Sequence, residues 1–162
     1  MRSLFSTAVL AGTTFAASEN KKTLSDVCRA LVLSGGGNNG SWEVGALYGL
    51  VNYGDPKDYE YEVVTGVSAG GINTAMIAGY DIGDEKALFD YLTQTSLDLH
   101  TSDIWKDWPL GKLSGALIMG GAVDNAPLLN YLQGVVLGFD SFKRRFVISA
   151  VNVDTGEYTE FT

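Results

Sequence analysis

The sequence contains very few of the residues that build disulfides and transition-metal sites. Among its 162 residues there is one cysteine, Cys28, and one histidine, His100. A single cysteine excludes an intrachain disulfide and a cysteine-built zinc site, and a single histidine excludes a histidine-rich metal site. We therefore expect no metal centre. Because Cys28 directly precedes an apolar run, we expect it to be a buried structural thiol.

Positive charge is also scarce. The chain has 11 Lys and Arg against 19 Asp and Glu, which gives a formal net charge of -8, and its longest basic run is Lys143-Arg144-Arg145. Such a chain does not attract a polyphosphate, so nucleic acid is not expected as a partner. The charge would also repel an anionic bilayer, but it permits contact with neutral lipids, micelles and small uncharged esters.

Long apolar runs are absent as well. No segment reaches 18 consecutive apolar residues, so we expect no transmembrane helix. At the N-terminus a positive charge at Arg2 precedes mildly apolar residues 4–15 and the small residues 16–18, which predicts a signal peptide over residues 1–17 and a polar linker over 18–27. We therefore expect a secreted protein or one in the secretory pathway. If the leader is not a signal peptide, the expected location is the cytoplasm.

Glycine, in contrast, is abundant, with 20 residues, and several glycines separate strand-like from helix-like segments. Strands that alternate with helices predict a three-layer α/β fold with a mainly parallel sheet and helices on both faces. The first strand is a continuous apolar run, so we expect it to be buried on both faces. Residues 101–125 have no assignable pattern. The periodicity predicts helices that begin near Ser41, Ile72, Asp84 and Asn125, and strands at 29–34, 59–65, 145–153 and 157–161.

The first of two glycine motifs, Gly35-x-Gly37-x-x-Gly40, lies between the first predicted strand and the first predicted helix. The free N–H groups of a first helical turn can hold an anionic atom, and a dinucleotide pyrophosphate is one such ligand. A dinucleotide fold, however, places an acidic residue at the end of the second strand, where this chain has Ser68. Dinucleotide binding therefore stays a third hypothesis.

The second motif, Gly66-Val67-Ser68-Ala69-Gly70, has the Gly-x-Ser-x-Gly pattern between a strand and a helix. This arrangement is typical of a nucleophile elbow, in which a serine occupies a strained turn and the flanking glycines remove side chains that would collide. The spacing from Gly37 to Ser68 matches one strand-helix-strand unit, so both loops should lie at the same edge of the sheet. Glycine amides beside the serine hydroxyl could then stabilise an oxyanion.

Together, these residues resemble the patatin-like phospholipases and acyl hydrolases. Residues 31–50 (LVLSGGGNNGSWEVGALYGL) and 63–80 (VVTGVSAGGINTAMIAGY) resemble the family closely, and residues 126–132 and 146–161 resemble later family segments more loosely. The resemblance implies a serine acyl hydrolase that cleaves phospholipid or acylglycerol esters through an acyl-enzyme. Such a cycle needs no metal and no organic cofactor. A lipid or ester substrate is implied, with transient contact with a membrane or micelle surface.

The resemblance also implies a role for each motif residue. Ser68 would be the nucleophile, Gly66 and Gly70 would shape its turn, and Gly35, Gly37 and Gly40 would form the glycine loop. The oxyanion hole would consist of the backbone amides of Gly36, Gly37 and Asn38.

Two departures from the family pattern matter. Family members commonly carry Arg or Lys where this chain has Asn39, and their base is an aspartate in an Asp-Gly-Gly or Asp-Gly-Ala triplet that this sequence does not contain. We therefore interpret residues 28–162 as an incomplete patatin-like domain without its catalytic aspartate, and we expect this chain to be inactive. The alternative is a non-catalytic lipid-binding or regulatory remnant of the family.

Other polar residues are weaker choices for a base. Asp154 precedes Thr155-Gly156, which is typical of a hairpin turn, and His100 is expected at a helix end. Trp105, Trp108 and the apolar stretch 113–123 could line an acyl-chain pocket or a lid, or they could be ordinary core.

Overall fold

The computed structural model describes residues 27–115, 117 and 121–162, so the predicted signal peptide and nearly all of the predicted linker lie outside the described residues. The chain divides into two compact units. The first comprises the residues up to Thr93 together with Ser141–Thr162, and the second comprises Gln94–Asp140. No helix in the described ranges is long and apolar enough to cross a membrane.

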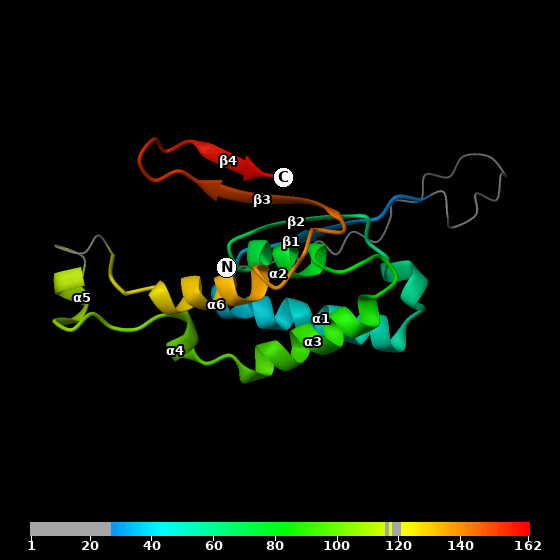
Figure 1. The fold of residues 1–162 in the computed structure, drawn as a ribbon, viewed down its shortest axis with the longest axis horizontal. Helices are drawn as coiled ribbons and strands as arrows, with labels where there is room; N and C mark the ends of the chain where they lie inside the picture. The colour runs from blue at the N-terminus through cyan, green and yellow to red at the C-terminus, as the bar shows by residue number, and fades with distance from the viewer. Residues whose placement is uncertain (1–26, 116, 118–120) are drawn as a thin grey trace, which may run out of the picture. The chain divides into compact units, whose positions relative to one another are not determined.

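The first unit is built on a four-stranded sheet with the order β1-β2-β3-β4 (Figure 1). β1 pairs with β2 and β2 with β3 in parallel, whereas β3 and β4 form an antiparallel hairpin. This arrangement confirms the predicted α/β fold with a mainly parallel sheet. The strands are β1 Ala30–Leu33, β2 Val63–Val67, β3 Arg145–Val151 and β4 Tyr158–Phe161.

The second strand begins four residues later than predicted. A short 3-10 helix, η3 (Pro56–Tyr59), occupies the residues before it, and the Asp55 carboxylate caps this helix by accepting a hydrogen bond from the Lys57 amide at 3.1 Å. The fixed backbone angle of Pro56 favours a helical turn over an extended strand at this point. Residues 59–62, which were predicted to begin the second strand, therefore do not belong to it.

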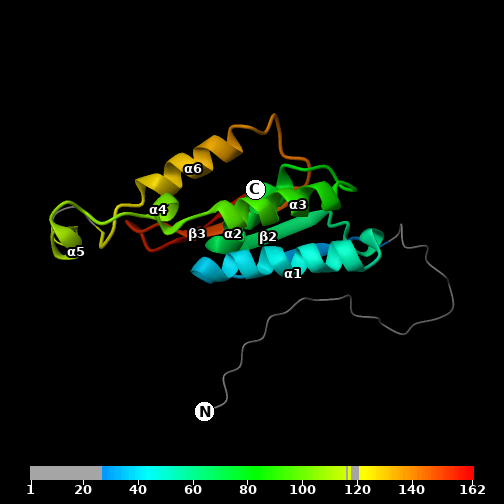
Figure 2. The same cartoon turned by 90° about the horizontal axis from the view of Figure 1, so that it is seen from below.

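Three helices accompany the sheet: α1 Gly40–Tyr53, α2 Ala69–Ala78 and α3 Glu85–Asp98. α1 ends at Tyr53, directly before Gly54, and α2 packs on β1, β2 and β3, with α1 on the same side of the sheet (Figures 1 and 2). Their shared core is apolar and buried. It includes Leu31, Leu33, Val44, Leu47, Val64, Met76, Ile77, Leu88 and Phe89.

The two faces of the sheet differ in burial. Leu31 and Leu33 point toward α2 and are buried, whereas Val32 between them has 59% of its surface exposed. The prediction that the first strand is buried on both faces is therefore wrong. Among the described residues of this unit, α2 covers one face of the sheet, and the face that carries Val32 is open.

A buried ion pair fastens the amino edge of the sheet. Nη1 of Arg144, one residue before β3, lies 2.6 Å from Oε1 of Glu85 at the start of α3, and both side chains are almost fully buried. The guanidinium also donates to three backbone carbonyls, those of Tyr61, Tyr80 and Asp81, at 2.7–3.1 Å. The turn between α2 and α3 is thereby tied to the residues just before β2 and β3.

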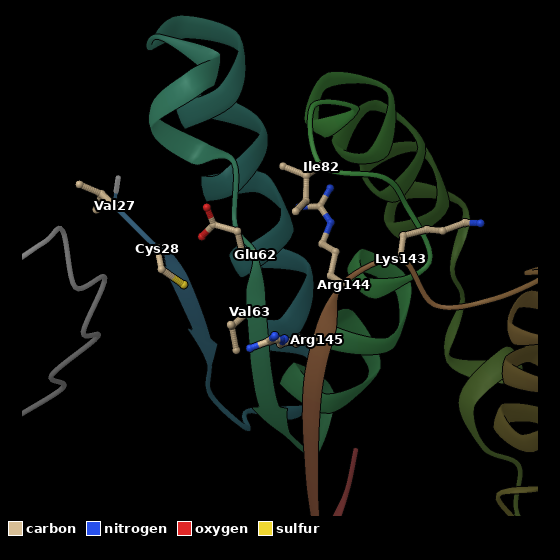
Figure 3. Close-up of a pocket in the computed structure, with 8 residues that line it drawn as sticks. All are labelled: Val27, Cys28, Glu62, Val63, Ile82, Lys143, Arg144 and Arg145. Atoms are coloured by element: carbon tan, nitrogen blue, oxygen red, sulfur yellow. The ribbon is translucent and has the colours of Figure 1, made fainter. Parts of the chain in front are cut away.

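Cys28 lies at the same edge, and the prediction that it is a buried thiol is wrong. Its side chain is exposed because it precedes the first residue of β1 and lines an open pocket of about 520 Å³ (Figure 3). The Glu62 carboxylate accepts a hydrogen bond from the thiol, and this bond raises the pKa of Cys28 above its usual range.

The second unit gives short helices to the stretch that the sequence left unassigned. α4 Thr101–Ile104 and α5 Gly111–Ser114 precede α6 Ala126–Val136, whose start agrees with the predicted start near Asn125. His100 is exposed and lies just before α4, where its backbone amide donates to the Asp103 carboxylate at 2.8 Å. Its predicted position at a helix end is confirmed.

Hydrogen bonds and an ion pair order this unit between α4 and α6. Lys106 and Asp124 form an isolated antiparallel bridge and an ion pair of 3.3 Å. The Asp124 carboxylate also accepts a hydrogen bond from the amide of Ala126, and this bond, with the charge of Lys106, lowers the pKa of Asp124. The Trp108 indole donates to the carbonyl of Gly121 at 2.9 Å. Trp108 is thus held within the unit.

Candidate active site

Ser68 stands at the turn between β2 and α2. Its backbone angles are φ 56° and ψ -125°, and it is the one non-glycine residue with positive φ in the part of the chain that the structure describes. An L-residue pays a steric cost of about 1–3 kcal/mol in such a conformation, which persists only where the surrounding structure imposes it. The strained turn predicted from the Gly-x-Ser-x-Gly pattern is present.

Both flanking glycines are required by close backbone packing. A Cβ atom on Gly70 would lie 2.6 Å from the carbonyl oxygens of Leu33 and Ser34, and one on Gly66 would overlap the carbonyl of Gly70. No rotamer change can relieve these clashes, because the obstructing atoms belong to the backbone. The two glycines therefore allow α2 to begin directly against the end of β1.

The glycine loop follows β1 and leads into α1. Gly37–Asn39 form a short 3-10 helix, η2, and Gly37 has a positive φ of 58°. The first hydrogen bond of this turn runs from the Asn39 amide to the Gly36 carbonyl at 3.1 Å. The amides of Gly37 and Asn38 precede that bond and have no partner within the turn, as in the first turn of any helix.

The loop and the serine turn lie side by side. A Cβ atom on Gly35 would be 3.1 Å from Cβ of Ser68, and one on Gly40 would be 3.0 Å from Cβ of Ala69. A side chain at either position would displace the serine turn or the first residue of its helix. The structure therefore brings both glycine motifs to the carboxyl edge of β1 and β2, as their spacing predicts.

The turn and the loop are open to solvent. Ser68 and all residues of 34–39 are exposed. The stretch from Ser34 to Trp42 contains no charged side chain, and position 39 is an asparagine. Any positive potential at this edge comes from backbone amides and from the starts of α1 and α2.

Sequence reasoning missed two polar residues beneath the loop, Glu43 and Asn73. Each is only 9% exposed. The Ser34 amide and hydroxyl both donate to Oε1 of Glu43 at 2.9 Å, while the Asn73 amide donates to Oε2 of Glu43 at 3.3 Å and to the Gly40 carbonyl at 3.1 Å. One signal was available: Glu43 shares a helical stripe with the apolar residues Val44, Leu47 and Val51.

Asp154, the other carboxylate considered as a base, lies exposed in the turn between β3 and β4. Its amide donates to the Asn152 side chain at 3.0 Å, and the turn closes with Gly156 at a positive φ of 72°. These contacts are those of the hairpin turn that the sequence predicts. The other residue considered, His100, belongs to the second unit.

Comparison with known families identifies the arrangement. A family model described as patatin-like phospholipase matches residues 31–162, a span that contains both glycine motifs and the β3–β4 hairpin. The chain belongs to the patatin-like phospholipase family. Members of this family generally hydrolyse lipid esters, so lipid is the expected class of ligand. No curated protein and no solved structure matches the chain.

The family match includes both segments on which the resemblance was based. The resemblance inferred from residues 31–50 and 63–80 is confirmed.

Proposed function

We propose that this patatin-like protein is a serine acyl hydrolase in which Ser68 attacks the carbonyl carbon of a phospholipid or acylglycerol ester. The observation that carries the proposal is the contact between the two motifs, with Gly35 against Ser68 in its strained turn. A loop that served only to pack a helix would not need an exposed serine beside it.

In the proposed cycle, attack by the Ser68 oxygen gives a tetrahedral intermediate whose oxyanion accepts hydrogen bonds from backbone amides. We assign these amides to Gly36, Gly37 and Asn38, which belong to the exposed loop beside the serine. Collapse of the intermediate releases the alcohol and leaves an acyl-enzyme, and attack by water then releases the fatty acid. None of these steps requires a metal or an organic cofactor.

The proton of the Ser68 hydroxyl needs an acceptor, and family resemblance assigns this role to an aspartate in an Asp-Gly-Gly or Asp-Gly-Ala triplet. The sequence contains no such triplet. We propose that residues 28–162 supply the nucleophile and the oxyanion hole but not the base. A serine hydroxyl without a base is a weak nucleophile, so we expect this chain to be inactive on lipid esters or to turn over activated esters only slowly.

A second candidate is a lipid-binding or regulatory remnant without catalysis. It is favoured by the sequence, which contains no Asp-Gly-Gly or Asp-Gly-Ala triplet to supply the base. In this case the exposed loop would hold an ester or a free fatty acid at a membrane or micelle surface without cleaving it.

An ester assay tests both candidates. Release of p-nitrophenol from butyrate and octanoate esters would be measured for the 162-residue chain and for Ser68→Ala, together with binding to phosphatidylcholine vesicles. Turnover above background that disappears in Ser68→Ala supports the hydrolase. Equal rates for the two proteins remove Ser68 from the mechanism, and vesicle binding without Ser68-dependent turnover supports the remnant.

A further inference from the structure

Glu43 is a buried carboxylate that the proposed cycle does not use. It lies in the first turn of α1, is 9% exposed, and accepts hydrogen bonds from two different elements. We propose that Glu43 is a positioning residue that holds the glycine loop and the serine turn in one arrangement. This inference rests on the proposed hydrolase function.

The first part of the arrangement is the contact between Glu43 and the glycine loop. Ser34 is the last residue before Gly35, and both its amide and its hydroxyl donate to Oε1 of Glu43 at 2.9 Å. The carboxylate thus closes residues 34–43 into a ring that contains the whole glycine loop. Because Gly35 lies directly against Ser68, a shift of Ser34 would move the loop relative to the nucleophile.

The second part is the contact between Glu43 and α2, the helix that follows Ser68. Asn73 is five residues beyond Ser68 on α2, and its side-chain amide donates both to Oε2 of Glu43 at 3.3 Å and to the carbonyl of Gly40 at 3.1 Å. The starts of α1 and α2 are thereby joined through one side chain. The positive ends of the two helix dipoles also favour a carboxylate at this place.

Glu43 acts through Ser34 and Asn73 and not on the substrate. Both its oxygens are occupied by donors from these two residues, and the Ser68 hydroxyl is not among its partners in the described ranges. A buried carboxylate leaves its partners unsatisfied when it is removed, so the loop would rearrange after substitution. A displacement of about 1 Å in a reacting group can lower the rate by roughly 100-fold.

The test compares Glu43→Ala and Glu43→Gln, with Glu85→Ala as the matched control. Glu85 is also a buried glutamate of this unit and lies at the amino edge of the sheet, away from the serine turn. Hydrolysis of p-nitrophenyl butyrate would be measured per folded molecule. We expect Glu43→Ala to lower kcat by about 10- to 100-fold with KM nearly unchanged, because geometry and not binding is lost.

The conservative variant and the control should respond differently. The amide oxygen of Glu43→Gln can still accept both bonds from Ser34, but its NH2 group then faces the Asn73 amide, which is also a donor, so its kcat should lie between those of Glu43→Ala and wild type. Glu85→Ala should lower the melting temperature and leave kcat unchanged. An equal loss of kcat in Glu43→Ala and Glu85→Ala, or no loss in Glu43→Ala, would overturn the positioning role.

Amide hydrogen exchange separates this inference from the proposed function. If wild type and Ser68→Ala hydrolyse esters equally, the hydrolase proposal fails, and exchange in peptides that cover residues 34–40 then decides the role of Glu43. We expect faster exchange there in Glu43→Ala, partial protection in Glu43→Gln, and no change in the β3–β4 hairpin. If Glu43→Ala leaves the exchange rate of residues 34–40 unchanged, the positioning role is wrong. If Glu43→Ala does not fold, Ser34→Ala takes its place and should show a smaller increase at the same peptides.

Discussion

At the scale of single residues, Ser68 combines a functional group with an unfavourable backbone. Its φ of 56° is imposed by the end of β2, the start of α2 and the two glycines that let them approach. Nothing in the serine side chain favours this conformation. The strain is therefore maintained by the packing of neighbouring elements, which fixes the direction of the Cα–Cβ bond that carries the hydroxyl.

The first prediction concerns this strain. Ser68→Ala and Ser68→Gly both lack the hydroxyl, but only glycine adopts positive φ without a steric cost. We expect Ser68→Gly to be more stable than Ser68→Ala by about 1 kcal/mol in urea unfolding. Within α2 the order should reverse, so that Ala75→Gly loses about 1 kcal/mol. If Ser68→Ala proves at least as stable as Ser68→Gly, the backbone at this turn is not strained in solution.

The second prediction concerns Cys28, the exposed thiol at the other edge of the sheet. The hydrogen bond to the Glu62 carboxylate raises its pKa, so at neutral pH it carries less of the reactive thiolate than an ordinary exposed cysteine. We expect its alkylation by iodoacetamide to rise with pH through a midpoint above that of a free thiol. Glu62→Gln removes the nearby negative charge and should move the midpoint down. A midpoint that is the same in both proteins would contradict the contact.

At the scale of helices and strands, sequence patterns predicted most of the elements. The apolar periodicity located the starts of α1, α2 and α6 and the strands of the β3–β4 hairpin to within a few residues. The misreadings have physical reasons. A continuous apolar run cannot show how many faces of a strand are covered, and the short helices of 101–125 are held by contacts between distant residues, such as Lys106 with Asp124.

The third prediction concerns the buried ion pair between Arg144 and Glu85, which joins these elements. Arg144 holds Glu85 and three carbonyls at the amino edge, so Arg144→Met leaves a carboxylate buried without its cation and should cost about 3–5 kcal/mol in unfolding free energy. Arg144→Met combined with Glu85→Leu should recover part of that loss. The measurement is a double-mutant cycle by urea denaturation. Additive losses would show that the two charges do not interact.

At the scale of the whole chain, the sequence could predict where the candidate site lies. It could not predict which buried residues hold the glycine loop and the serine turn in place. The spacing of Gly37 and Ser68 fits one β-α-β unit, and parallel strands bring their carboxyl ends to one edge, so the motifs had to meet. Glu43 gave no comparable signal, because a glutamate on a helix is ordinarily solvated. Its partners Ser34 and Asn73 are 9 and 30 positions away, and only the folded chain shows that they converge.

The fourth prediction uses the two faces of the sheet, which the sequence could not distinguish. Val32 and Val64 are both strand valines, but Val32 is 59% exposed on the open face and Val64 is fully buried beneath α2. Replacement by threonine keeps the shape of the side chain and adds one hydroxyl. Val64→Thr buries that hydroxyl and should cost about 1–3 kcal/mol, whereas Val32→Thr should change stability by less than about 0.5 kcal/mol.

The same pair also tests whether the open face limits solubility. Val67, Val151 and Tyr158 are exposed on the Val32 face, with 45%, 60% and 65% of their surfaces accessible. Contiguous apolar surface beside an unpaired edge strand promotes association, so Val32→Thr should raise the concentration at which the protein precipitates, and Val64→Thr should not. Equal losses of stability in the two variants would mean that the Val32 face is covered in solution, since a threonine hydroxyl is costly only where water is excluded.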